Sequence, residues 1–254
     1  MDITLSGNET REFDTEKSAE LMSRVVSWIS SIDSSDIILD FFSGSATTAH
    51  AVLDLNREDG GKRRFILVQM PEETDSNSEA CKAGYKTIAE IGKERIRRVI
   101  KKISDEKAAE LGGTYGLDLG FKVFKLTESH YKPWRNYHGQ DVKELEALFE
   151  EYRTPLVENW RGTEDGLLTE ILLIEGFPLD SRVREMEEYR DNRVRQISCG
   201  FHENRLLVCL DDTIQAATVK ALALKDGDIF VCLDTAVDDQ TKSRLSDKGL
   251  IKTI

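Results

Sequence analysis

The sequence has 254 residues, of which 39% are hydrophobic and 32% are charged, and its formal net charge is −12. This length allows one or two domains, each with a sizeable core. The negative charge excludes a protein that grips nucleic acid with its whole surface, because such a protein is basic. Any contact with DNA must come from a local patch or through a partner.

Helices and short apolar strands alternate through the first half of the sequence. Residues 17–32 have apolar side chains at helical spacing, residues 36–42 form a continuous apolar run typical of a buried strand, and residues 47–59 return to helical spacing. A second buried strand is predicted at 63–70, one long helix from 78 to 111, and a third strand at 119–126. Strands joined by helices in this order predict a parallel sheet.

The pattern changes after Leu126. Residues 131–140 have no clean period and are predicted to connect a domain at 1–130 to a smaller α/β domain at 141–254. In the second domain we expect helices near 141–153, from 213 and near 237–248, strands at 193–200, 204–212, 226–234 and 250–254, and a helix or strand at 167–178. The predicted fold class is α/β throughout.

The four cysteines, Cys81, Cys199, Cys209 and Cys232, have no Cys-x-x-Cys spacing, and the four histidines do not cluster with them. Reduced thiols and no metal site are therefore expected. The sequence has neither a signal-peptide pattern nor an apolar stretch of membrane-spanning length, so it predicts a cytoplasmic protein without a membrane partner.

The turn that follows the first predicted strand has the chemistry of a ligand site. A helix N-terminus presents N–H groups and a partial positive charge, which suit an anionic or polar ligand. Ser43, Gly44, Ser45 and Ala46 are small enough for close approach to the backbone. Glu72, just past the second strand, is placed to accept hydrogen bonds from ribose hydroxyls. The spacing favours an adenosine-containing ligand, and an ordinary turn is the alternative.

These residues also carry a resemblance to a known family. The stretch "DFFSGSATTAHAVLDLNREDGGKRRFILVQMPE", followed by "GYKTIAEIGKERIRRVIKKI" and "DLGFKVFKL", closely resembles the modification (Mod) subunit of type III restriction–modification systems. The resemblance is strong over residues 11–135 and weaker beyond them. These subunits are adenine-N6 DNA methyltransferases whose S-adenosylmethionine motif lies towards the C-terminus. The resemblance implies a Rossmann-like methyltransferase half-sheet, followed by a smaller C-terminal α/β unit, with S-adenosylmethionine as the cofactor.

The resemblance assigns cofactor-binding residues position by position. The family's Asp-x-Phe-x-Gly-Ser-Gly-Thr-Thr signature falls on Asp40, Phe42, Gly44, Ser45, Ala46, Thr47 and Thr48, with Ser43 in the same loop. In the family this loop holds the methionine end of the cofactor, and Glu72 would hold the ribose. The upstream Thr-Pro-Lys-Pro segment also lines the cofactor site, and it falls on Thr15, Glu16, Lys17 and Ser18.

Three departures from the family pattern matter. Ala46 replaces a glycine, and if that position needs a positive φ, alanine costs about 1–2 kcal/mol there. Both prolines of the upstream segment are missing. Adenine methylation also needs an Asp-Pro-Pro-Tyr-type tetrapeptide to hold a flipped-out base, and the four prolines, at 71, 133, 155 and 178, are never adjacent. We therefore expect the C-terminal, cofactor-binding part of a methyltransferase, with no catalytic residues of its own and inactive alone.

Basic side chains gather in the segment "GKERIRRVIKK". Arg95, Arg98 and Lys102 could contact DNA phosphates, although the solvated face of a long helix is the favoured alternative. Tyr131 and Trp134 belong to an aromatic and basic cluster that could stack on bases. Packing of the connector is the favoured interpretation of that cluster.

Two hypotheses of different classes follow. In the first, the chain is the cofactor-binding part of a site-specific DNA adenine-N6 methyltransferase and meets DNA only within a complete enzyme. In the second, it is a non-catalytic assembly module that docks a restriction subunit or a second modification subunit and keeps a relic of the cofactor pocket. The intact Phe42, Gly44, Ser45 and Glu72 favour the first hypothesis. Ala46 and the two missing prolines of the upstream segment favour the second.

Overall fold

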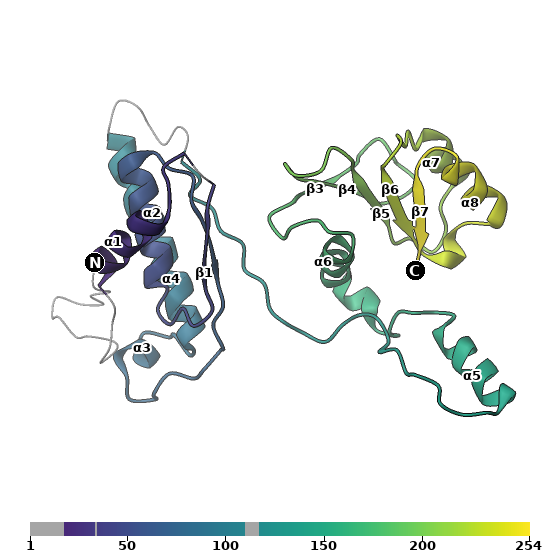
Figure 1. The fold of residues 1–254 in the computed structure, drawn as a ribbon, viewed down its shortest axis with the longest axis horizontal. Helices are drawn as coiled ribbons and strands as arrows, with labels where there is room; N and C mark the ends of the chain where they lie inside the picture. The colour runs from purple at the N-terminus through teal and green to yellow at the C-terminus, as the bar shows by residue number, and fades with distance from the viewer. Residues whose placement is uncertain (1–17, 34, 110–116) are drawn as a thin grey trace. The chain divides into compact units, whose positions relative to one another are not determined.

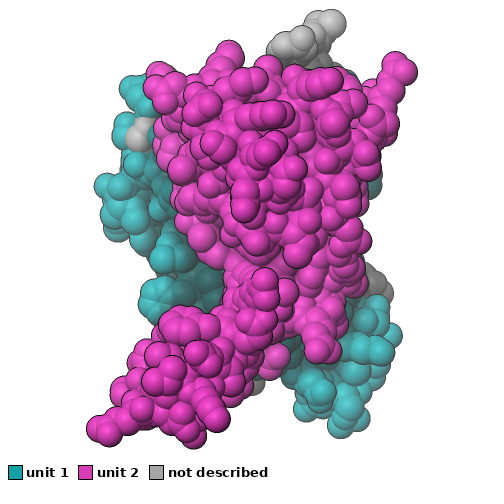
Figure 2. All heavy atoms as spheres, turned by 90° about the vertical axis from the view of Figure 1, so that its right-hand side faces the viewer, with its two compact units in different colours: residues 1–121 teal, residues 122–254 magenta. Residues whose placement is uncertain are grey.

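The computed structural model describes residues 18–33, 35–109 and 117–254. The chain divides into two compact units, unit 1 at residues 1–121 and unit 2 at residues 122–254 (Figure 2). The segment predicted as a connector, 131–140, lies in unit 2. Each unit combines helices with a sheet, so the predicted α/β class is confirmed at that level.

Unit 1 is a pair of parallel strands with helices packed on one face (Figure 1). In chain order its elements are α1 (Ala19–Ile29), β1 (Ile37–Asp40), α2 (Thr47–Asp59), β2 (Arg64–Leu67), α3 (Glu79–Lys82) and α4 (Ile88–Ala109). β1 and β2 pair in parallel, with Ile37 opposite Arg64 and Asp40 opposite Leu67. The strand–helix–strand arrangement predicted for residues 36–70 is therefore confirmed.

The inner face of this strand pair holds the core of unit 1. Phe65 of β2 packs against Val26 of α1 and Val52 of α2. Leu67 lies against a second cluster, in which α2 meets α4. The buried apolar members of that cluster are Ala46, Ala49, Leu53, Ile96, Val99 and Ile103. This packing sets the start of α2, and the loop before it, against the strand ends and α4.

The prediction of one helix from 78 to 111 is wrong. Gly84 has a φ of 95°, a left-handed conformation that ends α3, and the Tyr85 N–H donates to the carbonyl of Ala80 at 3.0 Å. The chain then makes an isolated bridge between Glu73 and Thr87 before α4 begins. The prediction overlooked two signals of this break, Gly84 and the Thr-x-x-Glu pattern at 87–90, which is typical of a helix start.

Two strand predictions for unit 1 also need correction. Residues 119–126 do not form a strand, since no described strand pairs with them. Their alternating sequence pattern is typical of a strand, but a strand also needs a neighbour that offers hydrogen-bonding groups. Their first half, with Leu119 and Phe121, packs against the α2–α4 cluster instead. Residues 36–42 and 63–70 were expected to be buried, but β1 and β2 expose alternate side chains.

Unit 2 contains a five-stranded mixed sheet in the order β3-β4-β5-β6-β7 (Figure 1). Its strands are β3 (Arg182–Glu185), β4 (Val194–Ser198), β5 (Leu206–Cys209), β6 (Ile229–Cys232) and β7 (Leu250–Thr253). Its helical elements are α5 (Val142–Tyr152), η1 (Trp160–Thr163), α6 (Glu164–Ile174), α7 (Ala216–Ala221), η2 (Asp234–Ala236) and α8 (Asp239–Ser246). β5, β6 and β7 are parallel, and β3 and β4 are antiparallel to their neighbours.

The sheet of unit 2 has a continuous core. All four residues of β5 are buried, and Phe230 of β6 is fully buried. The stretch 167–178, predicted as helix or strand, supplies α6, whose Leu167 and Ile171 pack into the same core. β3 was not predicted, because its four residues are all exposed and show no apolar alternation.

Candidate functional site

The loop between β1 and α2, residues 41–46, lies at the carboxyl ends of both parallel strands of unit 1. The ladder continues into it, since the Val68 N–H donates to the carbonyl of Asp40 at 2.8 Å and the Ser43 N–H donates to the carbonyl of Val68 at 3.2 Å. Ligands of open parallel sheets bind at this end of the strands. The residues predicted to bind a ligand therefore lie at this end of the strands, and we call residues 41–46 the cofactor loop after the role that the resemblance implies.

Ala46 is the residue that begins α2, and its backbone is left-handed. Its φ is 63° and its ψ is 35°, and it is the one non-glycine residue with a positive φ in the described part of the chain. Its N–H donates to the carbonyl of Ser43 at 2.8 Å, and its side chain is 2% exposed. An L-residue in this conformation costs about 1–2 kcal/mol. The sequence predicts this cost only if position 46 has a positive φ, and the structure gives it one.

The cofactor loop leaves open space where a ligand would approach. Gly44 also has a positive φ, 51°, and a Cβ built on it would meet no atom within 4 Å. The first N–H groups of α2 have no partners within the helix, and Ala46 has no side-chain group that could cap them. A helix N-terminus without such a cap favours a negatively charged ligand group.

The polar side chains of the signature are engaged within unit 1. The hydroxyl of Thr48 donates to Asp40 at 2.6 Å, and the other oxygen of that carboxylate accepts the Phe42 N–H at 3.2 Å. The side chain of Thr47 is buried and accepts a hydrogen bond from Arg95 at 3.0 Å. Ser45 is also buried. These contacts fasten the loop to β1 and α4. The groups that they leave for a ligand are the first N–H groups of α2 and the open side of Gly44.

Two residues that support the cofactor loop were missed by the sequence reasoning. The Gly44 N–H donates to Oε1 of Gln69 at 2.8 Å. Gly92 of α4 faces the loop, and a Cβ built on it would lie 3.3 Å from the Gly44 carbonyl oxygen and 3.4 Å from the Ala46 Cβ. A signal existed for Gln69, which is the one polar residue near the end of the predicted strand 63–70, whereas a glycine inside a helical pattern gave none.

Phe42, Glu72, Thr15 and Lys17 are the remaining residues predicted to bind the cofactor. Phe42 is 74% exposed beside Phe41, with their ring centroids 5.1 Å apart. Glu72 is exposed, and its carbonyl accepts the Ile88 N–H at 2.9 Å, which places it at the start of α4. Thr15 and Lys17 lie outside the described residues.

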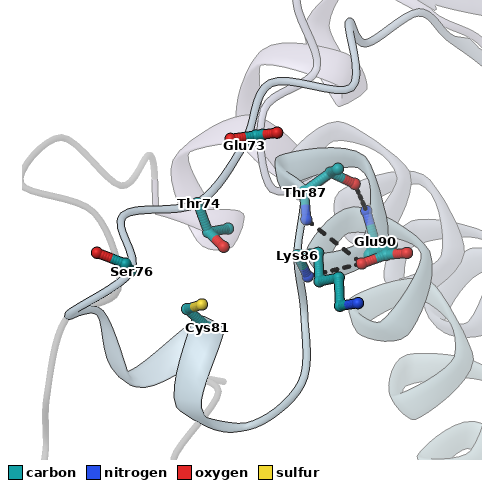
Figure 3. Close-up of a pocket in the computed structure, with 7 residues that line it drawn as sticks. All are labelled: Glu73, Thr74, Ser76, Cys81, Lys86, Thr87 and Glu90. Carbon is teal, nitrogen blue, oxygen red and sulfur yellow. Dashed lines mark hydrogen bonds between the residues drawn. The ribbon is translucent and has the colours of Figure 1, made fainter.

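A pocket of about 560 Å³ begins one residue after Glu72 (Figure 3). Its lining residues are Glu73, Thr74, Ser76, Cys81, Lys86, Thr87 and Glu90. The carboxylate of Glu90 accepts the N–H groups of Lys86 at 2.7 Å and Thr87 at 3.3 Å, and the Thr87 hydroxyl accepts the Glu90 N–H at 3.3 Å. This reciprocal capping box fixes the start of α4 and one wall of the pocket.

The three basic residues predicted to contact DNA do not form one surface. Arg95 is 5% exposed and bonds to Thr47, so its predicted contact with DNA phosphates does not fit its place in the core. Arg98 bonds to Glu94 at 2.9 Å, and Lys102 lies 3.7 Å from Glu106. The Glu94 hydrogen bond raises the pKa of Arg98 above its usual value. Pairing within the helix is typical of a solvated helix face.

The described residues contain neither a candidate metal site nor a helix that could span a membrane. Among them, no group of three or more His, Cys, Asp or Glu side chains could hold a metal ion. No helix built from them is both long and apolar enough to cross a membrane.

Comparison with known proteins matches a DNA methylase family and type III modification subunits. Residues 3–105 match a family model described as DNA methylase. The chain is 35% identical over 197 residues to the type III restriction-modification enzyme StyLTI Mod subunit of Salmonella typhimurium. This match covers 69% of this chain and 29% of that protein. The chain is also 38% identical over 117 residues to the EcoP15I Mod subunit of Escherichia coli, a match that covers 46% of this chain and 16% of that protein.

A relative of another type matches as well. The type II methyltransferase M.KpnI of Klebsiella pneumoniae is 35% identical over 98 residues, covering 39% of this chain and 23% of that protein. The matches therefore span less than a third of each of these relatives. They confirm the resemblance to type III modification subunits that the sequence predicts.

Proposed function

From this likeness to DNA methylases and to type III Mod subunits, we propose that the chain is the cofactor-binding part of a site-specific DNA adenine-N6 methyltransferase. The observation that carries the proposal is the left-handed cofactor loop at the carboxyl ends of β1 and β2, inside the region that matches the methylase model. In this proposal the two strands belong to a Rossmann-like methyltransferase sheet.

The cofactor loop fits the methionine end of S-adenosylmethionine. The open side of Gly44 gives room for close approach, and the uncapped start of α2 suits the carboxylate of the methionine end. The exposed Phe42 supplies an apolar edge, and Glu72 is the acid proposed to accept the ribose hydroxyls. When bound, S-adenosylmethionine supplies an activated methyl group. The residues of this chain position that group and do not act on the base.

The adenine and its target sequence are bound elsewhere in this proposal. No two prolines of the sequence are adjacent, so residues 1–254 contain no Asp-Pro-Pro-Tyr tetrapeptide to hold the exocyclic nitrogen of adenine. We propose that methyl transfer needs the part of a modification subunit that carries this tetrapeptide. DNA and a restriction subunit are partners of that complete assembly.

Titration calorimetry with S-adenosylmethionine tests the proposal. Gly44→Val should abolish the binding heat, since a side chain there would fill the open side of the loop. Gly60→Val is the matched control, because Gly60 also has a positive φ, 74°, and also has no atom within 4 Å of a built Cβ, but it ends α2 away from the loop. Loss of binding in both variants, or no heat from the unchanged chain at millimolar ligand, refutes the proposal.

A second candidate function is the assembly module with a relic pocket. The strained alanine at position 46 favours it, because glycine would hold the same conformation without the cost. The variant Ala46→Gly separates the two candidates. Binding of S-adenosylmethionine that appears only in this variant supports the relic, whereas binding by the unchanged chain supports the working cofactor site.

A further inference from the structure

Three side chains of unit 2 form a chain of hydrogen bonds that the proposed function does not use. Nδ1 of His130 lies 2.9 Å from a carboxylate oxygen of Glu170, and Nε2 of the same ring lies 2.9 Å from the hydroxyl oxygen of Thr163. The side chains of His130 and Glu170 are 12% and 25% exposed, and Thr163 is an exposed residue. The imidazole therefore lies between a carboxylate and the hydroxyl of a surface residue. We call these three residues the unit 2 triad.

One face of α6 carries two members of the unit 2 triad. Thr163 is the N-cap residue of α6, and Glu170 lies two turns further along on the same face. Gly166 lies between them, and a Cβ built on it would lie 2.9 Å from Cε1 and 3.1 Å from Nε2 of His130. A side chain at this position would push the ring away. Glycine is unfavourable inside a helix, and the seat of the imidazole gives a reason for this one.

Glu170 fixes both the orientation and the tautomer of His130. Its carboxylate accepts the backbone N–H of His130 at 2.8 Å as well as the ring Nδ1–H, and the hydroxyl of Ser129 donates to its other oxygen. Burial alone would raise the pKa of Glu170, but the hydrogen bonds from Ser129 and His130 lower it, so the carboxylate is ionised at neutral pH. An ionised carboxylate beside Nδ1 keeps the proton on that nitrogen, which leaves Nε2 free to accept the hydroxyl proton of Thr163.

The surroundings of Thr163 favour its hydroxyl as a nucleophile. The hydroxyl has two acceptors within reach, Nε2 of His130 at 2.9 Å and the carbonyl of Trp160 at 3.2 Å. Only the imidazole nitrogen can take the proton away. Because α6 begins at Glu164, directly after Thr163, the partial positive charge of the helix N-terminus lies beside the negative charge that would develop on a reacting carbonyl.

Acidic side chains at the same helix end narrow the class of substrate. Glu164 lies 3.3 Å from Arg193 and 3.5 Å from Arg195, and Asp165 lies 3.1 Å from Arg195. The arginines offset these two carboxylates, but an anionic substrate would still be repelled. The exposed position of Thr163 favours a small acyl group. A small neutral ester fits both conditions.

We propose that Thr163 and His130 are the nucleophile and the general base of an acyl-transfer site, with Glu170 as the residue that positions the base. Oγ1 of Thr163 attacks the carbonyl carbon of the ester, and its proton passes to Nε2 of His130. The imidazolium gives this proton to the leaving alcohol oxygen as the C–O bond breaks, which leaves the acyl group on Thr163. Water then attacks the acyl group and gives its proton to His130. The carboxylic acid leaves, and His130 returns the proton to Thr163.

Hydrolysis of p-nitrophenyl acetate by the full chain tests the inference. A p-nitrophenyl ester acylates faster than an alkyl ester of threonine hydrolyses, so the acetyl group should accumulate on Thr163. Peptide mass mapping of an acid-quenched reaction should find it there, and this measurement needs no variant. Acetylation of lysines alone, or hydrolysis no faster than in buffer, overturns the inference.

Substitutions of the two reacting residues give the kinetic test. Thr163→Val and His130→Gln should each lower kcat/KM about a hundredfold or more, whereas Thr163→Ser keeps a hydroxyl and should stay active. Thr169→Val and His202→Gln are the matched controls and should keep the rate of the unchanged protein. Thr169 also lies on α6 with its hydroxyl bonded to a backbone carbonyl, and a ring nitrogen of His202 lies 3.1 Å from another. Equal rates for Thr163→Val and Thr169→Val would overturn the inference.

Glu170→Gln tests the positioning residue. The amide cannot stabilise the imidazolium, so kcat should fall about tenfold or more with KM unchanged. Glu175→Gln is the matched control, because Glu175 is a glutamate of unit 2 that bonds to Lys252 at 2.6 Å, and it should leave kcat unchanged. A carboxylate that only fastens the chain to α6 would give a lower free energy of unfolding in urea with kcat unchanged, and that result overturns the role of Glu170. None of these variants should change S-adenosylmethionine binding, so the failure of either proposal leaves the other standing.

Discussion

Ala46→Gly is the substitution that weighs backbone strain against packing in the cofactor loop. The alanine has a φ of 63° and a side chain that is 2% exposed. Glycine adopts this conformation freely, so the change relieves about 1–2 kcal/mol of strain in the folded state. The relief applies at one position, since no other described non-glycine residue has a positive φ.

The same substitution removes a buried methyl group and loosens the unfolded chain. The lost methyl costs about 0.8 kcal/mol of burial, and the extra freedom of glycine in the unfolded state costs about 0.4–1 kcal/mol. These losses are about as large as the relief of strain. We expect the free energy of unfolding of Ala46→Gly to lie within about 1 kcal/mol of that of the unchanged protein.

Ala49→Gly supplies the matched control. Ala49 is three residues further along α2, is fully buried and belongs to the same core cluster. Its replacement loses a methyl group and incurs the helix-interior penalty of glycine, with no strain to relieve, so we expect about 2 kcal/mol of destabilisation. The difference between the two variants therefore measures the strain at position 46.

Urea unfolding of both variants, followed by circular dichroism, makes the comparison, with S-adenosylmethionine titrations on the same samples. Ala46→Gly should bind the cofactor at least as tightly as the unchanged chain, because the loop keeps its shape. Equal destabilisation by the two substitutions would refute the reasoning. Position 46 would then carry no strain, and the alanine would be no mark of a weakened site.

Three further predictions concern the supports of the loop and the core of unit 2. Gln69→Leu should weaken S-adenosylmethionine binding about fivefold by removing the acceptor of the Gly44 N–H, whereas Gln69→Glu, which keeps an acceptor, should bind normally in the same titration. Gly92→Ala should weaken binding because its Cβ would crowd the Gly44 carbonyl, and adding Ala46→Gly should restore part of the loss in a double-mutant cycle. Asp228→Asn should destabilise unit 2 by about 1.5–3 kcal/mol at neutral pH, measured by urea unfolding. Burial alone would raise the pKa of Asp228, but hydrogen bonds from Arg205 and Lys225 lower this pKa below its ordinary value. The ionised carboxylate therefore stabilises unit 2 above about pH 4, where an unfolded aspartate is also ionised. As the pH falls below that value, the difference in free energy of unfolding between Asp228→Asn and the unchanged protein should shrink.

The parts of the fold that were predictable are those that depend on neighbouring residues. β1, α2 and β2 follow from a run of apolar residues, a helical period and turn residues within a few positions of each other. The third strand at 119–126 could not be judged in this way, because a strand forms only where another strand offers its backbone groups. The break between α3 and α4 falls at Gly84 and is followed by the capping box of Thr87 and Glu90, so it also carries local signals, which the prediction of one helix overlooked.

The site was predictable in its position and less so in its internal contacts. The cofactor loop and its left-handed residue follow from the signature, but the contact of Gly44 with Gln69 joins residues 25 positions apart. Arg95 illustrates the same limit. A basic residue in a basic helix predicts a surface contact, and only the packing of α4 against α2 turns this one towards Thr47.

The inward direction of the signature side chains sharpens the choice between a working site and a relic. Asp40, Thr47 and Thr48 hold the loop in place, so the groups left for the proposed ligand are the N–H groups at the start of α2 and the open side of Gly44. Main-chain recognition depends on the shape of the loop and not on the identity of residue 46. The alanine retains that shape, with a φ of 63°, and the backbone strain lowers the stability of the folded protein. A working site and a relic therefore differ in whether the unchanged chain binds S-adenosylmethionine, which the titrations of the unchanged chain and of Ala46→Gly measure. The paired glycine substitutions at positions 46 and 49 measure the strain that the alanine carries.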